Sequence, residues 1–183
     1  MDYKKIKRIA IIGSPGSGKS TMAKKLGEIT GIEYHHLDKY YHNANWVPKP
    51  KEEFRNIVSE LASKDEWIMD GNYRGTLDLR VNRADLVIFL NYSSVFSIYR
   101  IYKRIFKSKL GRVKRTDIPE DCHDGWFPKE FIMWTWNYNK NILPDTYRIL
   151  SELKINESSL KVFKRVRDTE IFLNEFKKHY ESK

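Results

Sequence analysis

The segment Gly13–Ser20 constrains this chain more than any other. It reads Gly-Ser-Pro-Gly-Ser-Gly-Lys-Ser, which fits the pattern G-x-x-x-x-G-K-[ST]. The glycines let the backbone curl until successive N–H groups point at one anion. Lys19 can then reach the β- and γ-phosphates of a nucleotide, and the Ser20 hydroxyl can bind Mg²⁺. A turn without a ligand would not need the Lys-Ser pair, so the motif predicts a nucleoside triphosphate site.

The sequence on either side of this loop supports that prediction. Residues 8–12 form a short, almost wholly apolar run, which is typical of a buried parallel strand. Residues 20–26 have the pattern of a helix that ends near Gly31, and its N-terminus adds a positive dipole end to the loop. The residues expected to contact the nucleotide are Gly13, Ser14, Pro15, Gly16, Ser17, Gly18, Lys19, Ser20 and Thr21.

Further apolar runs alternate with helical stretches along the rest of the chain. This alternation predicts an α/β fold, with an open parallel sheet covered by helices on both faces. The expected strands, after the first, are 33–38, 67–70, 85–90 and 160–164. The expected helices are 50–61, 76–81, 94–107, 129–153 with a break near Pro144, and a last helix capped by Asp168, with Ile171, Phe172, Leu173 and Phe176 on its apolar side. Residues 108–128 are expected to be irregular.

Two acidic residues end expected strands, and catalytic groups gather at the carboxyl ends of such strands. Asp70 follows a buried run, so its carboxylate can hold the Mg²⁺ shell opposite Ser20; the alternative is a turn or helix-cap acid. Asp38 can accept a proton from a substrate hydroxyl or share the Mg²⁺; the alternative is a turn residue that bonds its own backbone. A nearby aromatic group forms either a substrate wall or a small core: Tyr40, Tyr41, His42 and Trp46.

Several arginines are candidates for phosphate binding. Arg100 and Arg104 are four residues apart on one expected helix, so both guanidinium groups can meet one polyphosphate. Such groups neutralise charge that develops on a transferred phosphoryl. The alternative is a solvated helix face. Arg74 is a third candidate, and Arg112 and Arg115 could move in when the irregular segment closes.

The net charge is +10, from 34 basic and 24 acidic residues. The basic residues concentrate at 100–115 and 161–167, which fits a lid over phosphates, a nucleic-acid surface or a solvated face. The longest apolar run, 86–90, is too short to cross a membrane, and the N-terminus does not read as a signal peptide. Cys122 is the only cysteine, so no intrachain disulfide can form. We therefore expect a cytoplasmic protein with one domain over 1–183.

Three motifs together resemble the adenylate-kinase-like branch of P-loop kinases: the loop 13–20, the stretch Trp-Ile-Met-Asp-Gly-Asn-Tyr-Arg at 67–74, and the pair Arg100 and Arg104. The chain is more similar still to DNA topology modulation proteins (FlaR-related). The motifs that carry this second resemblance are Leu37-Asp38, Trp46-Val47, Asp70-Gly71-Asn72-Tyr73, Leu77-Asp78-Leu79-Arg80, Arg83-Ala84-Asp85 and Trp134-x-Trp136. The resemblance implies three α/β/α layers, five parallel strands in the order 2-3-1-4-5, and a helical lid over about 108–128.

The resemblance also implies roles for individual residues. Asp70 and Arg74 match the magnesium-shell acid and the phosphate arginine of adenylate kinases, and Arg100 and Arg104 match an arginine pair that contacts ATP before the lid. The match does not extend to the acceptor site. A Gly-Asp-x-x-Arg type segment is missing, and Trp134 and Trp136 stand where adenylate kinases carry arginines. These departures argue against AMP as the acceptor.

The sequence thus predicts a kinase, monomeric or dimeric, that transfers the γ-phosphoryl of Mg·ATP to a small-molecule or nucleotide acceptor. Lys19 would bind the phosphates, Ser20 and Asp70 would hold Mg²⁺, and Asp38 would position or deprotonate the acceptor. Arg100, Arg104 and Arg74 would stabilise the transferred group. Two alternatives remain: a nucleotide-gated DNA-binding protein with weak ATPase activity, although no DNA-reading motif is evident, and an NTPase without an acceptor.

Overall fold

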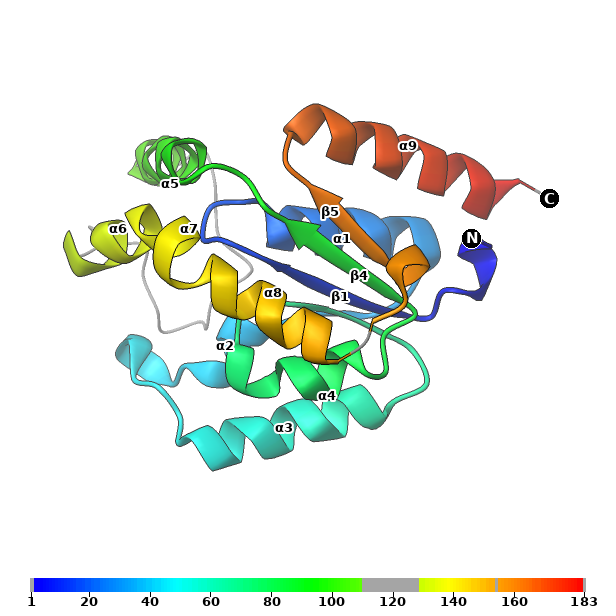
Figure 1. Cartoon of the computed structure of the whole chain (residues 1–183), viewed down its shortest axis with the longest axis horizontal. Helices are drawn as coiled ribbons and strands as arrows, with labels where there is room; N and C mark the ends of the chain where they lie inside the picture. Colours follow the sequence, from blue (N-terminus) through cyan, green and yellow to red (C-terminus); the bar gives the residue numbers. More distant parts are fainter. Residues whose placement is uncertain (1, 110–128, 154, 183) are drawn as a thin grey trace.

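A parallel β-sheet forms the centre of the computed structural model, which describes residues 2–109, 129–153 and 155–182 (Figure 1). Within these residues, five strands lie in the order β2-β3-β1-β4-β5, and every neighbouring pair is parallel. The predicted fold class and strand order are therefore confirmed. The strands are β1 (Arg8–Gly13), β2 (Tyr34–His36), β3 (Trp67–Asp70), β4 (Leu86–Leu90) and β5 (Leu160–Phe163).

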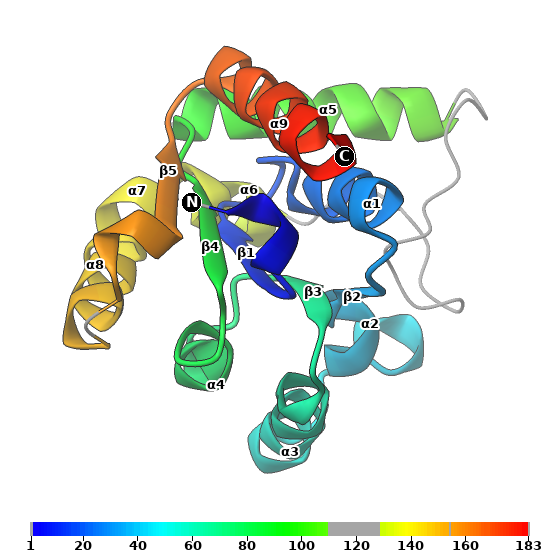
Figure 2. The same cartoon turned by 90° about the vertical axis from the view of Figure 1, so that its right-hand side faces the viewer.

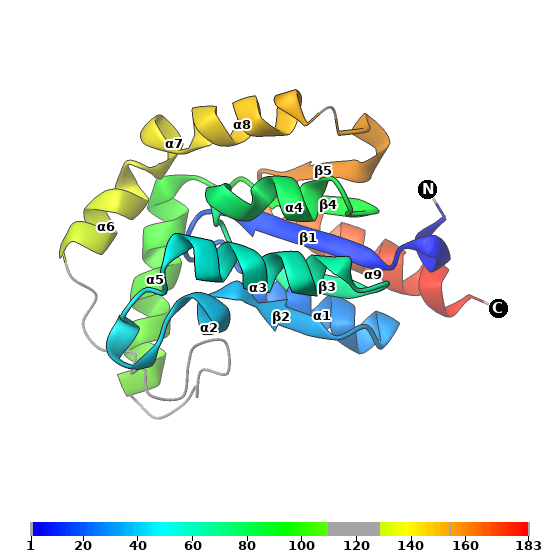
Figure 3. The same ribbon diagram turned by 90° about the horizontal axis from the view of Figure 1, so that it is seen from below.

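Helices cover both faces of the sheet (Figure 2). One face carries α1 (Lys19–Thr30) and α9 (Val166–Glu181). The other carries α3 (Lys51–Ser63), α4 (Leu77–Val81) and α8 (Leu143–Glu152). Toward the carboxyl ends of the strands lie α2 (Leu37–Tyr41), α5 (Ser94–Lys109), α6 (Lys129–Trp136) and α7 (Tyr138–Asn141) (Figure 3). Short 3-10 turns occupy Tyr3–Lys5, Ala44–Trp46, Arg74–Thr76 and Glu157–Ser159. No described helix is long and apolar enough to cross a membrane.

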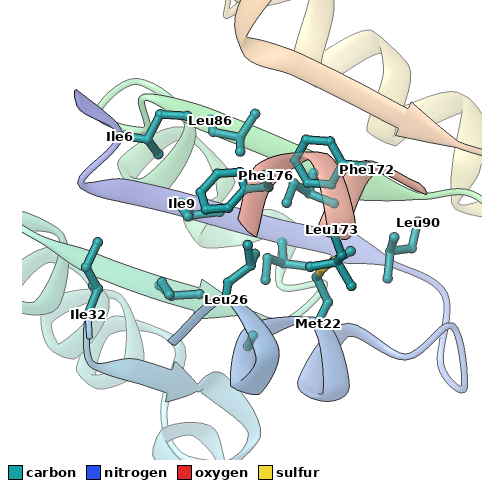
Figure 4. Close-up of a cluster of buried hydrophobic side chains, with 14 of the residues drawn as sticks. Ile6, Ile9, Met22, Leu26, Ile32, Leu86, Leu90, Phe172, Leu173 and Phe176 are labelled. Carbon is teal, nitrogen blue, oxygen red and sulfur yellow. The ribbon is translucent and has the colours of Figure 1, made fainter. Parts of the chain in front are cut away.

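The side chains of β1 divide between two apolar cores. Ile9 and Ile11 face the helices α1 and α9, whereas Ala10 and Ile12 face the opposite layer. Successive side chains of a strand point to opposite faces, so a strand covered on both sides must be apolar throughout. This is why β1 reads as an unbroken apolar run. Figure 4 shows the first core, which α9 closes with Phe172 and other side chains.

The apolar face of α9 that packs against the sheet is predicted correctly except for one residue. Phe172, Leu173 and Phe176 are buried, but Ile171 is 46% exposed. Residue 171 lies about 100° around the helix from residue 172, so it falls outside the stripe that contacts the sheet. Phe176 is fully buried, and its ring centroid lies 4.9 Å from that of Tyr3 and 5.8 Å from that of Phe172.

We expect Phe176→Ala to lower the free energy of unfolding by about 3–5 kcal/mol, because it removes a fully buried ring and leaves a cavity. Denaturant unfolding, followed by circular dichroism, measures this loss. Ile171→Ala is the matched control on the same helix, and it should change stability by less than about 0.5 kcal/mol. Equal losses in the two variants would contradict the assignment of this face.

The second strand is shorter than predicted. It ends at His36, and α2 begins at Leu37, so Asp38 lies in the first turn of a helix and not at the end of a strand. A carboxylate in this position is favoured by the positive end of the helix dipole. The prediction failed because a helix of this length leaves no periodic signal in the sequence.

The predicted helix over 129–153 is broken near Pro144, as expected, and also at a second point. Its breaks fall at Asn137 and Ile142, and Pro144 lies in the first turn of α8. Proline is tolerated there because the first turn has no intrahelical acceptor for its missing N–H. The last helix begins at Val166, so Asp168 lies in its first turn and does not cap it. The first two residues of the predicted irregular lid, 108–128, are helical, because α5 continues to Lys109. The rest of that segment, with Arg112, Arg115 and Cys122, lies outside the described residues.

Candidate phosphate-transfer site

The glycine-rich loop lies between β1 and α1 and packs against the start of α5. Gly16 and Gly18 have φ angles of +72° and +95°, which disfavour a side chain. A Cβ at Gly16 would lie 2.5 Å from the carbonyl oxygen of Ser97, and one at Gly18 would lie 2.9 Å from the Arg100 guanidinium. Glycine is therefore required at these two positions for the loop to pack against α5, as well as for the backbone turn that the motif predicts.

Lys19 begins α1 and folds back over the loop. Its Nζ donates to the carbonyl oxygens of Gly13 at 3.0 Å and Ser14 at 2.9 Å. The loop is also attached to α5, since the hydroxyls of Ser14 and Ser97 are 2.8 Å apart and both side chains are buried. The ammonium group thus lies at the concave backbone that the motif assigns to the phosphates.

Ser20 and Asp70 meet at the carboxyl edge of the sheet. The Ser20 Oγ, in the first turn of α1, donates at 3.5 Å to Oδ1 of Asp70, the last residue of β3. Asp70 is only 5% exposed, and burial raises its pKa, whereas His36 and Lys19 act to lower it. A buried carboxylate beside a hydroxyl supplies the oxygen ligands that Mg²⁺ prefers, and a bound cation would compensate its lost hydration. The donor set therefore fits magnesium.

Sequence reasoning missed His36. Its Nδ1 bonds Asp70 Oδ2, and both side chains are buried. The contact arises because β2 and β3 are paired in a register that sets His36 directly beside Asp70. Asp70 is thus held at both oxygens, by Ser20 on one and His36 on the other. Only the strand register reveals this contact, and no local pattern in the sequence encodes it.

Asp38 contacts a residue whose role the sequence did not assign. Tyr73, in the segment after β3, donates its hydroxyl to Asp38 Oδ1 at 2.6 Å. Burial raises the pKa of Tyr73, and the Asp38 charge raises it further, so the hydroxyl stays a donor at neutral pH. The Tyr73 ring lies 4.8 Å from the rings of both Tyr41 and Phe54. Of the predicted aromatic group, Tyr41 therefore belongs to a core under the loop.

The rest of the aromatic group lies around this core. The Tyr40 hydroxyl is 2.9 Å from His35 Nδ1, and the rings of His42 and Trp46 are 5.2 Å apart. Asn45 and Trp46 both have positive φ angles, 55° and 62°, and Trp46 is half-buried. The turn thus holds its tryptophan beside His42, close to the helix that carries Asp38.

The predicted phosphate arginines differ in their surroundings. Arg100 Nη1 donates to the Ser17 carbonyl oxygen at 3.2 Å, so it touches the loop. Arg104 lies one turn further along α5 and is half-buried. Arg74 instead pairs with Asp145 of α8, with 2.6 Å between Nη1 and Oδ2. The structure thus places Arg100 at the glycine-rich loop, whereas Arg74 is paired with α8, on the face of the sheet that does not carry α1.

The loop, the strand order and the helix layers together define the fold of P-loop kinases. Two shikimate kinases have it: the Acinetobacter baumannii protein in complex with shikimate (TM-score 0.62, 13% identity, 99% of this chain and 98% of that one) and the Bacteroides thetaiotaomicron protein (0.56, 16%, 97% and 99%). The deoxyadenosine kinase from M. mycoides, solved with the products dCMP and a flexible dCDP, is also similar (0.51, 19%, 93% and 98%). No family model and no curated protein matches the chain. At these identities the likeness establishes the fold.

Proposed function

We propose that this protein is a Mg·ATP-dependent phosphotransferase that acts on a small-molecule or nucleotide acceptor. The observation that carries the proposal is the placement of Lys19 over the glycine-rich loop, with the Ser20–Asp70 pair beside it on the same sheet edge. The similar solved structures support it, because their names describe kinases. Membership of the DNA topology modulation group stays a prediction, since no match supports it.

The chain's own groups divide the work of phosphoryl transfer. The loop N–H groups and Lys19 bind the phosphate oxygens, and Arg100 adds a guanidinium at the loop, where it neutralises charge on the transferred group. Arg104 and Arg74 are further candidates for that role. Ser20 and Asp70 would hold Mg²⁺, which supplies a positive charge for the phosphate oxygens when bound.

Asp38 is the proposed acceptor-binding group. Tyr73 occupies its Oδ1, so Oδ2 is the oxygen that would accept the proton of an acceptor hydroxyl. In the reaction, that proton passes to Asp38, the acceptor oxygen bonds the γ-phosphorus, and the bond from the γ-phosphorus to the β–γ bridging oxygen breaks. ADP leaves with the electron pair of that bond.

The direct test is a transfer screen with γ-labelled ATP and Mg²⁺ across nucleosides, nucleotides and small hydroxylated metabolites. We expect label to appear on one class of acceptor. Phosphate release that proceeds at one rate whether or not any acceptor is present would instead indicate an NTPase. Tight, salt-sensitive binding to duplex DNA without transfer would indicate the nucleic-acid alternative.

Asp38→Asn is expected to lower the rate of transfer about 100-fold, because the amide cannot take the acceptor proton. The affinity for Mg·ATP, measured by calorimetry, should stay unchanged, since the hydrogen bond described for the Asp38 side chain goes to Tyr73 and not to the loop. Asp65→Asn is the matched control, because Asp65 is exposed at the turn before β3. A full transfer rate in Asp38→Asn would mean that Asp38 has a structural role only.

A further inference from the structure

Arg80, in α4, is a charged side chain that the proposed function does not use. It is fully buried, with 0% of its surface exposed. Arginine is almost never fully buried unless its charge and its donors are satisfied. The buried groups around Arg80 must therefore provide hydrogen-bond acceptors for its guanidinium.

Three backbone carbonyl groups satisfy the Arg80 guanidinium. Nη1 donates to the Gly71 oxygen at 3.0 Å, Nη2 to the Tyr73 oxygen at 3.0 Å, and Nε to the Thr76 oxygen at 3.4 Å. All three acceptors belong to the segment 71–76, which connects β3 to α4. One planar group thus fixes three points of one loop, which a flexible ammonium group cannot do.

The charge of Arg80 acts on the same region. Burial lowers the pKa of Arg80 to about 10, while the negative charge of Asp70 opposes this shift, so the side chain is a cation at neutral pH. The charged guanidinium keeps all of its N–H groups as donors, which the three carbonyl groups of the loop require.

The loop is packed tightly on its other side. Gly71 has a φ of +147°, and a Cβ there would lie 2.9 Å from Leu37 Cβ, at the start of α2. The same loop carries Tyr73, whose hydroxyl donates to Asp38 in α2. A continuous path of contacts therefore runs from Arg80 through the backbone and hydroxyl of Tyr73 to Asp38.

We propose that Arg80 is a positioning residue, which holds the loop 71–76 so that Tyr73 fixes Asp38 relative to Asp70. This inference rests on the proposed function for its catalytic consequence. It predicts that loss of Arg80 disturbs the acceptor side of the site and leaves the phosphate loop in place, because that loop is held separately by Ser97 and Arg100.

The test compares Arg80→Met and Arg80→Lys with Arg83→Met. Arg83 is the matched control, because its exposed guanidinium also donates to a backbone carbonyl, that of Ser63 at 3.2 Å. Hydrogen exchange measured by mass spectrometry should be faster at 71–76 and 37–41 in both Arg80 variants and unchanged at 13–20. Exchange that is unchanged at 71–76, or that rises equally in all segments, would overturn the proposal.

Kinetics give a second readout that a merely structural residue would not produce. For hydrolysis of Mg·ATP, we expect kcat of Arg80→Met to fall about 100-fold, the cost of a misplaced reacting group, with KM for ATP unchanged. Tyr73→Phe keeps every backbone contact of Arg80 and removes only the hydroxyl, so it should lower kcat without faster exchange at 71–76. Normal kcat in Tyr73→Phe would break the proposed path.

The two proposals fail in different ways. If the wild-type protein turns over no ATP with water or with any acceptor, the proposed function is wrong, while the exchange rates still decide whether Arg80 holds the loop. If the wild-type protein is active and both Arg80 variants keep its kcat, the positioning role is wrong and the proposed function stands. Should Arg80→Met not fold, Arg80→Lys and Tyr73→Phe supply the decisive comparison.

Discussion

Lys19→Ala is expected to reduce turnover of Mg·ATP about 1,000-fold, the scale seen when one preorganised charge-stabilising donor is removed. The Lys19 ammonium lies over the loop, bound to the carbonyl oxygens of Gly13 and Ser14, and these contacts place its charge where the phosphates would bind. A coupled assay of ADP release measures the loss, and calorimetry measures the accompanying drop in nucleotide affinity.

The fold should survive this substitution, because the Lys19 side chain contributes nothing to either apolar core. Lys24→Ala is the matched control: Lys24 lies on the same helix, is exposed, and pairs only loosely with Glu28 at 3.9 Å. Circular dichroism should report the same melting temperature for both variants. Undiminished turnover in Lys19→Ala would refute the assignment of the loop.

Asp70→Asn is expected to lower turnover by at least about 100-fold and to raise the Mg²⁺ concentration needed for half-maximal rate. The amide keeps the shape of the side chain and removes the charge that would face the cation. Titration of turnover with Mg²⁺ measures both effects. Asp65→Asn, at an exposed position, should leave the Mg²⁺ dependence unchanged.

The same substitution separates catalysis from stability. Burial raises the pKa of Asp70, so the folded state binds its proton more tightly than the unfolded state does. The ionised carboxylate therefore costs stability once the pH rises through that pKa, and a neutral amide avoids this cost. We expect a free energy of unfolding at neutral pH that is equal to or greater than that of the wild type. A large loss of stability would contradict this account of Asp70.

The sequence predicts the parts of this protein that depend on local pattern. The loop 13–20 is recognisable because each fixed residue type has its own task, and the buried strands are recognisable because a sheet covered on both faces needs unbroken apolar runs. The order of the strands followed from the family resemblance and is confirmed. Asp70 could be placed at the carboxyl edge because it directly follows such a run.

The parts that were missed depend on contacts between distant segments. The bond between His36 and Asp70 follows from the register of β2 against β3, which neither strand encodes alone. The burial of Arg80 follows from three carbonyl groups that face one point, a property of backbone geometry. Asp38 was assigned to a strand because α2 is too short to show helical periodicity.

The two ends of the described chain meet near the amino ends of the strands, at the opposite end of the sheet from the glycine-rich loop (Figure 3). There the Tyr3 ring packs against Phe176, and the Lys4 ammonium donates to the carbonyl of Ser182. An affinity tag, a fluorescent fusion or a tether to a sensor chip attached at either end would therefore project away from the glycine-rich loop. The proposed binding of ATP can accordingly be tested on immobilised protein, with the tether at the opposite end of the sheet from that loop.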